Sequence, residues 1–155
     1  MDLIDLNPGK FDAIFIPGGF GAAKNLSTFA TDGPNMKVDP RIEKIIKEAV
    51  ATNTHIGLCC ISPILISKVL GKAYGGPGST ITLGKKGSGF PYSDSIDIAI
   101  SFGNTLKDKD VKEICVDEIN NIVTTPAYMK EARPHEVYDG IQMMVKEVID
   151  RIGKK

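Results

Sequence analysis

Short apolar runs and amphipathic stretches alternate along the first part of the chain. Residues 11–16 and 54–58 are compact apolar runs of the kind that form strands buried in a parallel sheet. Between them, residues 40–52 place apolar side chains at helical spacing, and the preceding Asp39 suits the cap of a helix that starts at Pro40. A strand, a helix and a second strand in this order predict a right-handed parallel crossover.

The last part of the chain predicts a hairpin and a long helix. Two β-prone runs, residues 113–116 and 122–125, flank the Asn-Asn pair at 120–121, which tolerates left-handed turn angles. Cys115 falls in the first of these strands and is expected to be structural. Residues 137–152 carry apolar side chains along one helical face, so they predict the final helix.

The segments between these elements have a weaker pattern. Residues 21–38 are polar and turn-rich and predict an ordered loop with one helical turn near residues 26–30. A brief strand is expected over residues 80–83, and a helix over residues 94–100. The sequence Phe90-Pro91-Tyr92 between them is either a lid or an anchor that packs a loop onto the body.

The composition is that of one globular domain, with 155 residues of which 42% are hydrophobic and 25% are charged. Lys plus Arg and Asp plus Glu both number 19, so no net charge favours nucleic acid or an anionic membrane as a partner. The first residues have neither the basic region nor the apolar run of a signal peptide. We expect a cytoplasmic location, or a mitochondrial one if a targeting segment precedes Met1.

The cysteines are the candidates for chemistry. Two of the three are adjacent, which does not suit a disulfide framework, and no CxxC pair or histidine cluster predicts a metal site. Cys60 follows the second apolar run and precedes Pro63, where a helix can begin. Backbone N–H groups and the helix dipole at that place favour the thiolate, which is the nucleophile. The alternative is that Cys59 and Cys60 are small buried hydrophobes.

Three runs of sequence point to a known family. They are PGGFGAAKNLS from Pro17, GLCCISP from Gly57 and VTTPAYM from Val123, and they resemble the ES1/ElbB branch of the DJ-1/PfpI superfamily, the class I glutamine amidotransferase-like proteins. The resemblance extends from about Phe11 to the C-terminus. It implies an α/β fold, a flavodoxin-like three-layer sandwich with a mostly parallel sheet and helices on both faces, and it gives Cys60 the position of the family's reactive cysteine.

The resemblance also implies a reaction. In such relatives an oxyanion hole comes from two backbone N–H groups, which correspond here to Gly19 and Ile61. The implied activity is a glyoxalase-type conversion of small reactive carbonyls by Cys60, without a metal or a soluble cofactor. The expected partners are a small-molecule carbonyl substrate and a second copy of the chain in a homodimer.

Two features depart from the superfamily pattern. Many members carry a histidine as base for the cysteine where this chain has Pro126. Here the base for Cys60 could be His135, near the start of the last helix. The alternative is that His135 is a surface residue and another group is the base. His55 is expected to cap or pack at the start of its strand. Relatives begin with a strand, a helix and further strands, including a glutamate beside the cysteine, and we expect this chain to lack that first segment.

Three functions therefore remain open from the sequence. The first is a cofactor-independent glyoxalase-like enzyme that uses Cys60. The second is a non-catalytic, redox-sensing protein in which Cys60 is oxidised. The third is a glutamine amidotransferase-like subunit, which normally needs the histidine replaced here by Pro126.

Overall fold

A mostly parallel sheet organises the computed structural model, which describes residues 3–153. Within those residues the sheet has four strands, in the order β1, β2, β6 and β5. The first three run parallel, and β5 is antiparallel to β6. Their bounds are Ala13–Ile16 for β1, His55–Cys59 for β2, Ile122–Thr125 for β6 and Cys115–Asp117 for β5. The parallel sheet expected from the sequence is confirmed.

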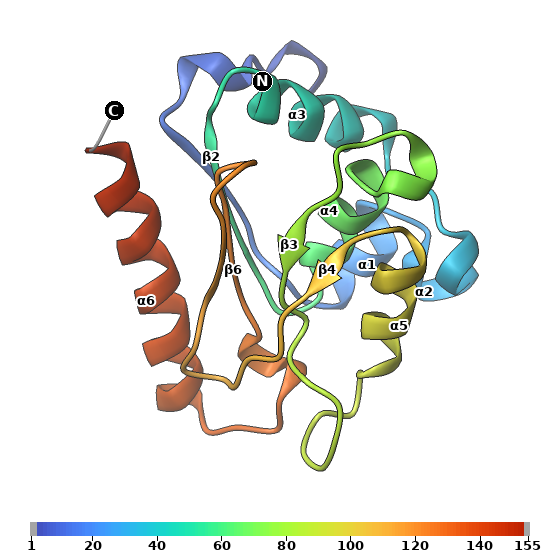
Figure 1. The fold of residues 1–155 in the computed structure, drawn as a ribbon, viewed down its shortest axis with the longest axis vertical. Coiled ribbons are helices and arrows are strands. Elements are labelled where there is room, and N and C mark those ends of the chain that lie inside the picture. Colours follow the sequence, from blue (N-terminus) through green and yellow to red (C-terminus); the bar gives the residue numbers. More distant parts are fainter. Residues whose placement is uncertain (1–2, 154–155) are drawn as a thin grey trace.

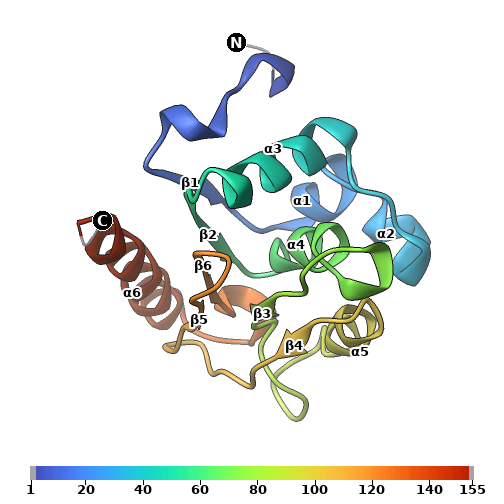
Figure 2. The same ribbon diagram turned by 45° about the horizontal axis from the view of Figure 1, so that its top comes forward.

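Helices cover both faces of this sheet (Figure 1). The helix α6 lies alone on one side, and the other helices lie on the opposite side, as the turned view in Figure 2 also shows. A small parallel sheet of β3 and β4 lies next to α5. The bounds are Phe20–Asn25 for α1, Phe29–Asp32 for α2, Pro40–Ala51 for α3, Pro63–Val69 for α4, Asp94–Ser101 for α5, Pro134–Ile152 for α6, Thr80–Ile81 for β3 and Thr105–Leu106 for β4.

Short 3₁₀ turns join several of these elements. They are Leu3–Asp5, Pro8–Lys10, Gly33–Asn35, Lys72–Tyr74 and Ala127–Met129.

Within residues 3–153 none of the helices combines the length and the apolar character that a bilayer-spanning helix needs.

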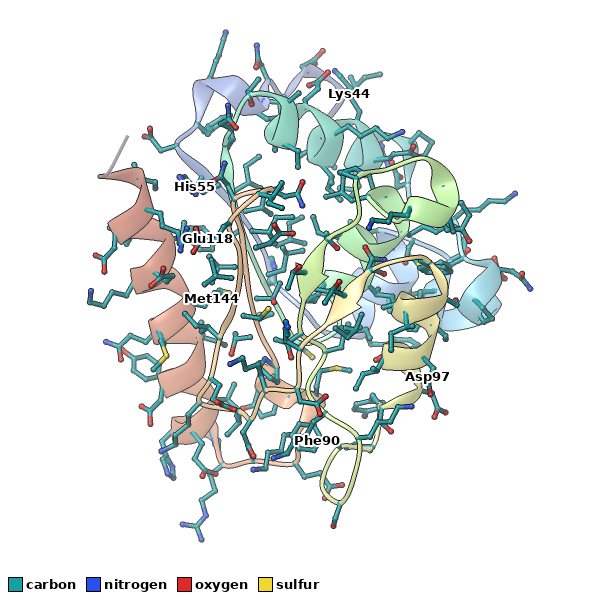
Figure 3. All side chains as sticks on the ribbon, in the orientation of Figure 1. Lys44, His55, Phe90, Asp97, Glu118 and Met144 are labelled. Carbon is teal, nitrogen blue, oxygen red and sulfur yellow. The ribbon has the colours of Figure 1, made fainter. Side chains whose placement is uncertain are left out.

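Alternation along the central strands divides the core between the two helical layers. Ile56 and Leu58 of β2 belong to the larger core cluster, which includes the buried faces of α3, α4 and α5. Val123 of β6 points the other way and packs with Met144 and Val148 of α6, and Figure 3 shows Met144 directed from the helix toward the sheet. Because successive side chains of a strand point to opposite faces, a sheet covered on both sides needs apolar residues at nearly every position.

Most of the periodic segments form the elements that the pattern predicts. The helix expected at 40–52 is α3, and the Asp39 side chain accepts the Arg41 N–H at 2.8 Å as its cap. The hairpin expected near the C-terminal part is β5 and β6, with Asn121 in the left-handed region at a φ of 55°. The helix expected through Ile100 is α5, although Ser93 at its N-cap makes no side-chain capping hydrogen bond.

Two expectations are wrong. Residues 11–16 were expected to form a buried strand, but β1 is an edge of the described sheet and Phe15 is 43% exposed. Residues 21–38 were expected to form a loop with one helical turn near residues 26–30; α2 is a short turn of helix close to that place, but α1 was not expected. The small side chains of Ala22 and Ala23 are buried, so α1 packs closely where its polar sequence indicated a turn.

Gly140 provides a test of the packing of α6. A Cβ atom added there would lie 2.0 Å from the carbonyl oxygen of Val111 and 3.1 Å from Oγ1 of Thr125. Gly140→Ala must therefore move the helix, and we expect it to lower the free energy of unfolding by about 2 kcal/mol in urea titrations. Gly153→Ala is the control, because its nearest neighbouring atom would be 3.9 Å away. Equal stability of the two variants would contradict this packing.

Candidate active site

A strained residue joins β2 to α4. The strand ends at Cys59, the helix begins at Pro63, and Cys60 between them has a φ of 59°. A left-handed backbone costs a residue with a side chain about 1–2 kcal/mol, so glycine is the usual occupant of such a position. A cysteine in this conformation is held there by its surroundings, and such strain is concentrated at functional sites.

Hydrogen bonds from neighbouring strands hold this turn, which we call the elbow (residues 59–63). The Cys60 N–H donates to the carbonyl oxygen of Thr125 at the end of β6, at 3.1 Å. The buried Ser62 hydroxyl lies 2.8 Å from the carbonyl oxygen of Ile16 at the end of β1, and it accepts the Cys59 N–H at 3.2 Å. The elbow is thus fixed to the carboxyl ends of both strands that flank β2.

The glycine-rich loop after β1 lies directly against the elbow. A Cβ atom on Gly18 would be 2.4 Å from Cβ of Cys60, 2.7 Å from the carbonyl oxygen of Cys59 and 3.3 Å from Sγ of Cys60. Only a residue without a side chain fits in this space. The next residue, Gly19, has a φ of 95° and is the N-cap of α1. The glycines therefore allow the backbone of this loop to approach the cysteine.

The three cysteines have different environments. Burial raises the pKa of the Cys59 thiol, and a hydrogen bond from the Gly18 backbone opposes this only in part. Burial is also the largest cause that raises the pKa of Cys115, which lies in β5. Both groups are therefore kept as thiols, which are poor nucleophiles. Cys60 is the one of the three that lines a pocket described below.

The pocket at Cys60 has a volume of about 480 Å³. Segments far apart in the sequence form its wall: the start of α1, the first half of α2, the elbow, the start of α5 and the turn after β6. Most of the wall is apolar or aromatic. Its residues are Gly19, Phe20, Ala23, Phe29, Ala30, Cys60, Ile61, Pro91, Tyr92, Asp94, Ser95, Ile98, Tyr128 and Met129.

The structure brings together three of the four site residues expected from the sequence. Cys60, Gly19 and Ile61 all line the pocket. The N–H groups of Gly19 and Ile61 donate no backbone hydrogen bond to another described residue, so they are available to a ligand.

Neither histidine joins them. His135 is exposed in the first turn of α6 and lies outside the pocket lining, as expected of a surface histidine rather than a base for Cys60. His55 is buried at the start of β2, where packing was expected. Figure 3 shows it near the end of the sheet opposite Phe90. The geometry therefore assigns neither histidine a role at Cys60.

Sequence reasoning missed the aromatic wall. Phe20 follows the two glycines directly and Tyr128 follows Pro126-Ala127, so both lie inside the runs that carry the family resemblance. Their position within these runs could have predicted that they lie at the site. Phe29 and Asp94 lie outside those runs, and only the fold places them at the pocket.

An ion-pair cluster fixes the loop that carries Pro91 and Tyr92. The Asp110 carboxylate contacts Nζ of Lys130 at 2.5 Å and Nζ of Lys85 at 2.9 Å. Both ammonium groups lie within 6 Å of the Phe90 ring centroid, at 5.8 and 5.6 Å. Phe90 is only 4% exposed, so it is the anchor of this loop rather than part of a lid.

The fold has a close likeness among solved structures. An isoprenoid biosynthesis protein with an amidotransferase-like domain from Ehrlichia chaffeensis matches with a TM-score of 0.81 and 26% identity, over 97% of this chain and 63% of that one. The mostly parallel sheet with helices on both of its faces therefore has the amidotransferase-like fold of that protein.

Relatives identified by sequence are more similar to this chain than that solved structure is. A human protein named glutamine amidotransferase-like class 1 domain-containing protein 3, mitochondrial, and a rat protein named ES1 protein homolog, mitochondrial, are each 42% identical over 99% of this chain. The chain is therefore similar to ES1 proteins over nearly its whole length. It spans 56% of the length of both relatives, and no protein-family model matches it.

The strain at Cys60 predicts a pair of opposite effects on stability. Cys60→Gly removes the energetic penalty of the left-handed backbone, while Cys60→Ala keeps it. We therefore expect Cys60→Gly to be more stable than Cys60→Ala by about 1 kcal/mol in urea unfolding. At Cys59, which lies in β2, we expect the reverse order: Cys59→Gly should be less stable than Cys59→Ala, because glycine weakens a strand by about 0.5–1 kcal/mol relative to alanine. The same order at both positions would contradict the elbow geometry.

The Asp110 cluster predicts a pH dependence. Hydrogen bonds from Lys130 and Lys85 hold the pKa of the Asp110 carboxyl well below its usual range. The stabilisation from this charge is therefore fully present above the ordinary pKa of about 4 and is lost progressively as the pH falls from there through the lowered pKa. We expect Asp110→Asn to lower stability by about 1 kcal/mol at pH 7, with the two proteins converging in acid.

The control for this cluster is Asp97→Asn. Asp97 pairs with Lys86 on the exposed surface of α5, where ion pairs contribute little. The stabilities of the wild type and of both variants are measured by thermal unfolding at pH 7 and at pH 3. A difference between wild type and Asp110→Asn that is independent of pH would rule out a role for the Asp110 charge.

Proposed function

We propose that this chain is the catalytic part of a cysteine-dependent enzyme that acts on reactive carbonyl compounds. The observation that supports this is the convergence of the strained Cys60 with the backbone of Gly19 and Ile61 at one pocket. A nucleophile and backbone N–H groups that donate to no other described residue, all in one lining, are the parts that addition to a carbonyl requires.

In the proposed reaction Cys60 attacks the aldehyde carbon of a 2-oxoaldehyde. A C–S bond forms, the aldehyde oxygen takes a proton, and the product is a hemithioacetal. A proton then moves from the first carbon to the second, and the hydroxyl proton of the first carbon passes to the oxygen of the second, so that the first carbon is oxidised to a thioester and the second is reduced to an alcohol. Water cleaves the thioester to give a 2-hydroxy acid and the free thiol. The oxidation and the reduction occur in one molecule, so the balance needs no external oxidant or reductant.

The backbone donors would act on the oxygen of the attacked carbonyl. The N–H groups of Gly19 and Ile61 would stabilise the negative charge that develops there, and one such donor is typically worth about 3–4 kcal/mol in the transition state. Asp94, Tyr92 and Tyr128 are the lining side chains with an ionisable group that can take part in the proton shift.

Glutamine amide transfer is less well supported by the same pocket. In related chemistry a histidine beside the cysteine carries the proton, but the pocket lining contains neither histidine of this chain. The family name alone therefore does not decide the reaction. Addition of the cysteine to an aldehyde involves no amine leaving group that must be protonated, and the lining contains Asp94, Tyr92 and Tyr128 for the later proton shift.

The test is turnover of methylglyoxal, followed by loss of the dicarbonyl and appearance of the 2-hydroxy acid. We expect Cys60→Ser to reduce turnover to the background rate and Cys59→Ser to retain most of it, because only Cys60 lines the pocket. Equal loss in both variants would overturn the proposal, and so would the absence of turnover of methylglyoxal and of phenylglyoxal by the wild-type chain above a heat-killed control.

A further inference from the structure

We infer that the Cys60 pocket selects uncharged electrophiles with an aromatic or bulky apolar body, and not the smallest dicarbonyls or anionic compounds. This inference rests on the proposed function for the reaction but on the pocket lining for the selectivity. The substrates that we expect from it are 2-oxoaldehydes with an aromatic substituent, such as phenylglyoxal.

The first argument is the size of the pocket. A volume of about 480 Å³ falls within the range of about 300–1,000 Å³ that holds ligands much larger than a compound of two or three carbons. A small dicarbonyl bound at Cys60 would leave most of the wall in contact with water. A larger apolar body would displace that water and gain the hydrophobic contribution.

The second argument is the kind of side chain at the pocket. Phe20, Tyr92 and Tyr128 line it although they are 72%, 58% and 52% exposed. Large aromatic side chains this exposed gain contact area when a ligand binds between them, and their rings favour other rings. Phe29 and Met129 extend the apolar wall. These residues come from separate elements, so the apolar surface faces the ligand from several sides.

The third argument is charge. Among the described residues that line the pocket, Asp94 is the one that carries a charge, and none is a lysine or an arginine that could balance it. A carboxylate beside the nucleophile disfavours anionic ligands. The cations Lys130 and Arg133 line a separate hollow beyond Tyr92 and Tyr128, and Lys130 is already paired with Asp110. The lining therefore also disfavours the free carboxylate of glutamine.

Alkylation of Cys60 measures this selectivity without turnover. In each reaction Sγ forms a bond to carbon, the thiol proton passes to the buffer, and iodide leaves with the electron pair of the broken C–I bond. The reagents are iodoacetamide, which is small and neutral, N-benzyl iodoacetamide, which adds a ring, and iodoacetate, which is anionic. The rate at Cys60, measured by peptide mass mapping, is divided by the rate of the same reagent with glutathione, which removes differences in intrinsic reactivity.

We expect the benzyl reagent to react about tenfold faster than iodoacetamide on this normalised scale. Iodoacetate should react about threefold slower than iodoacetamide. Phe20→Ala and Tyr92→Ala should each remove several-fold of the benzyl preference, because each deletes part of the aromatic wall. Asp94→Asn should abolish the discrimination against iodoacetate.

Matched controls lie outside the pocket. Tyr138→Ala removes an equally exposed tyrosine from α6, and Asp97→Asn removes a carboxylate from the same helix as Asp94. Both should leave the normalised rates unchanged. Equal rates for the three reagents would overturn the inference, and so would a benzyl preference that survives in the double variant Phe20→Ala, Tyr92→Ala.

Turnover separates the inference from the proposed function. The ratio of kcat/KM for phenylglyoxal to that for methylglyoxal should exceed about tenfold. Turnover of methylglyoxal without any preference in either assay would overturn the inference and leave the proposed function intact. A benzyl preference in alkylation without turnover of any dicarbonyl would support the pocket selectivity and overturn the carbonyl reaction.

Discussion

The left-handed backbone at Cys60 is the constraint on which the site depends. It turns the chain from β2 into α4 within a few residues and places the cysteine at the pocket. The carbonyl oxygen of Thr125 and the Ser62 hydroxyl hold this conformation through the ends of the neighbouring strands. Gly18 leaves the space that the turn needs. The parallel sheet is thus the support of a strained residue, and its strand ends meet at the candidate active site.

The sequence predicted those parts of the fold whose signal is local. Apolar periodicity and a capping aspartate located α3, the Asn-Asn pair located the hairpin, and an apolar stripe located α6. The elbow was also predicted, because an apolar run followed by Cys60 and Pro63 is a local pattern. The family resemblance added the backbone of Gly19 and Ile61, which the structure places at the same pocket.

The rest depends on contacts between distant segments, which no local pattern records. An apolar run does not show whether its strand is central or at an edge, so β1 with its exposed Phe15 was misjudged. The helices α1 and α2 form in a polar stretch because packing outweighs weak propensity. The pocket wall joins Phe29 and Asp94 from elements far apart in sequence. His135 was a candidate by residue type alone, and the fold leaves it on the surface of α6.

The central claim is that the fold presents Cys60, and neither of the other cysteines, as the nucleophile. Treatment of the native chain with less than one equivalent of iodoacetamide, followed by peptide mapping of all three cysteines, tests it directly. The account predicts that the label is found at Cys60, because burial raises the pKa of Cys59 and Cys115 and keeps them as thiols. Label distributed equally between Cys59 and Cys60, or found first at Cys115, would contradict it.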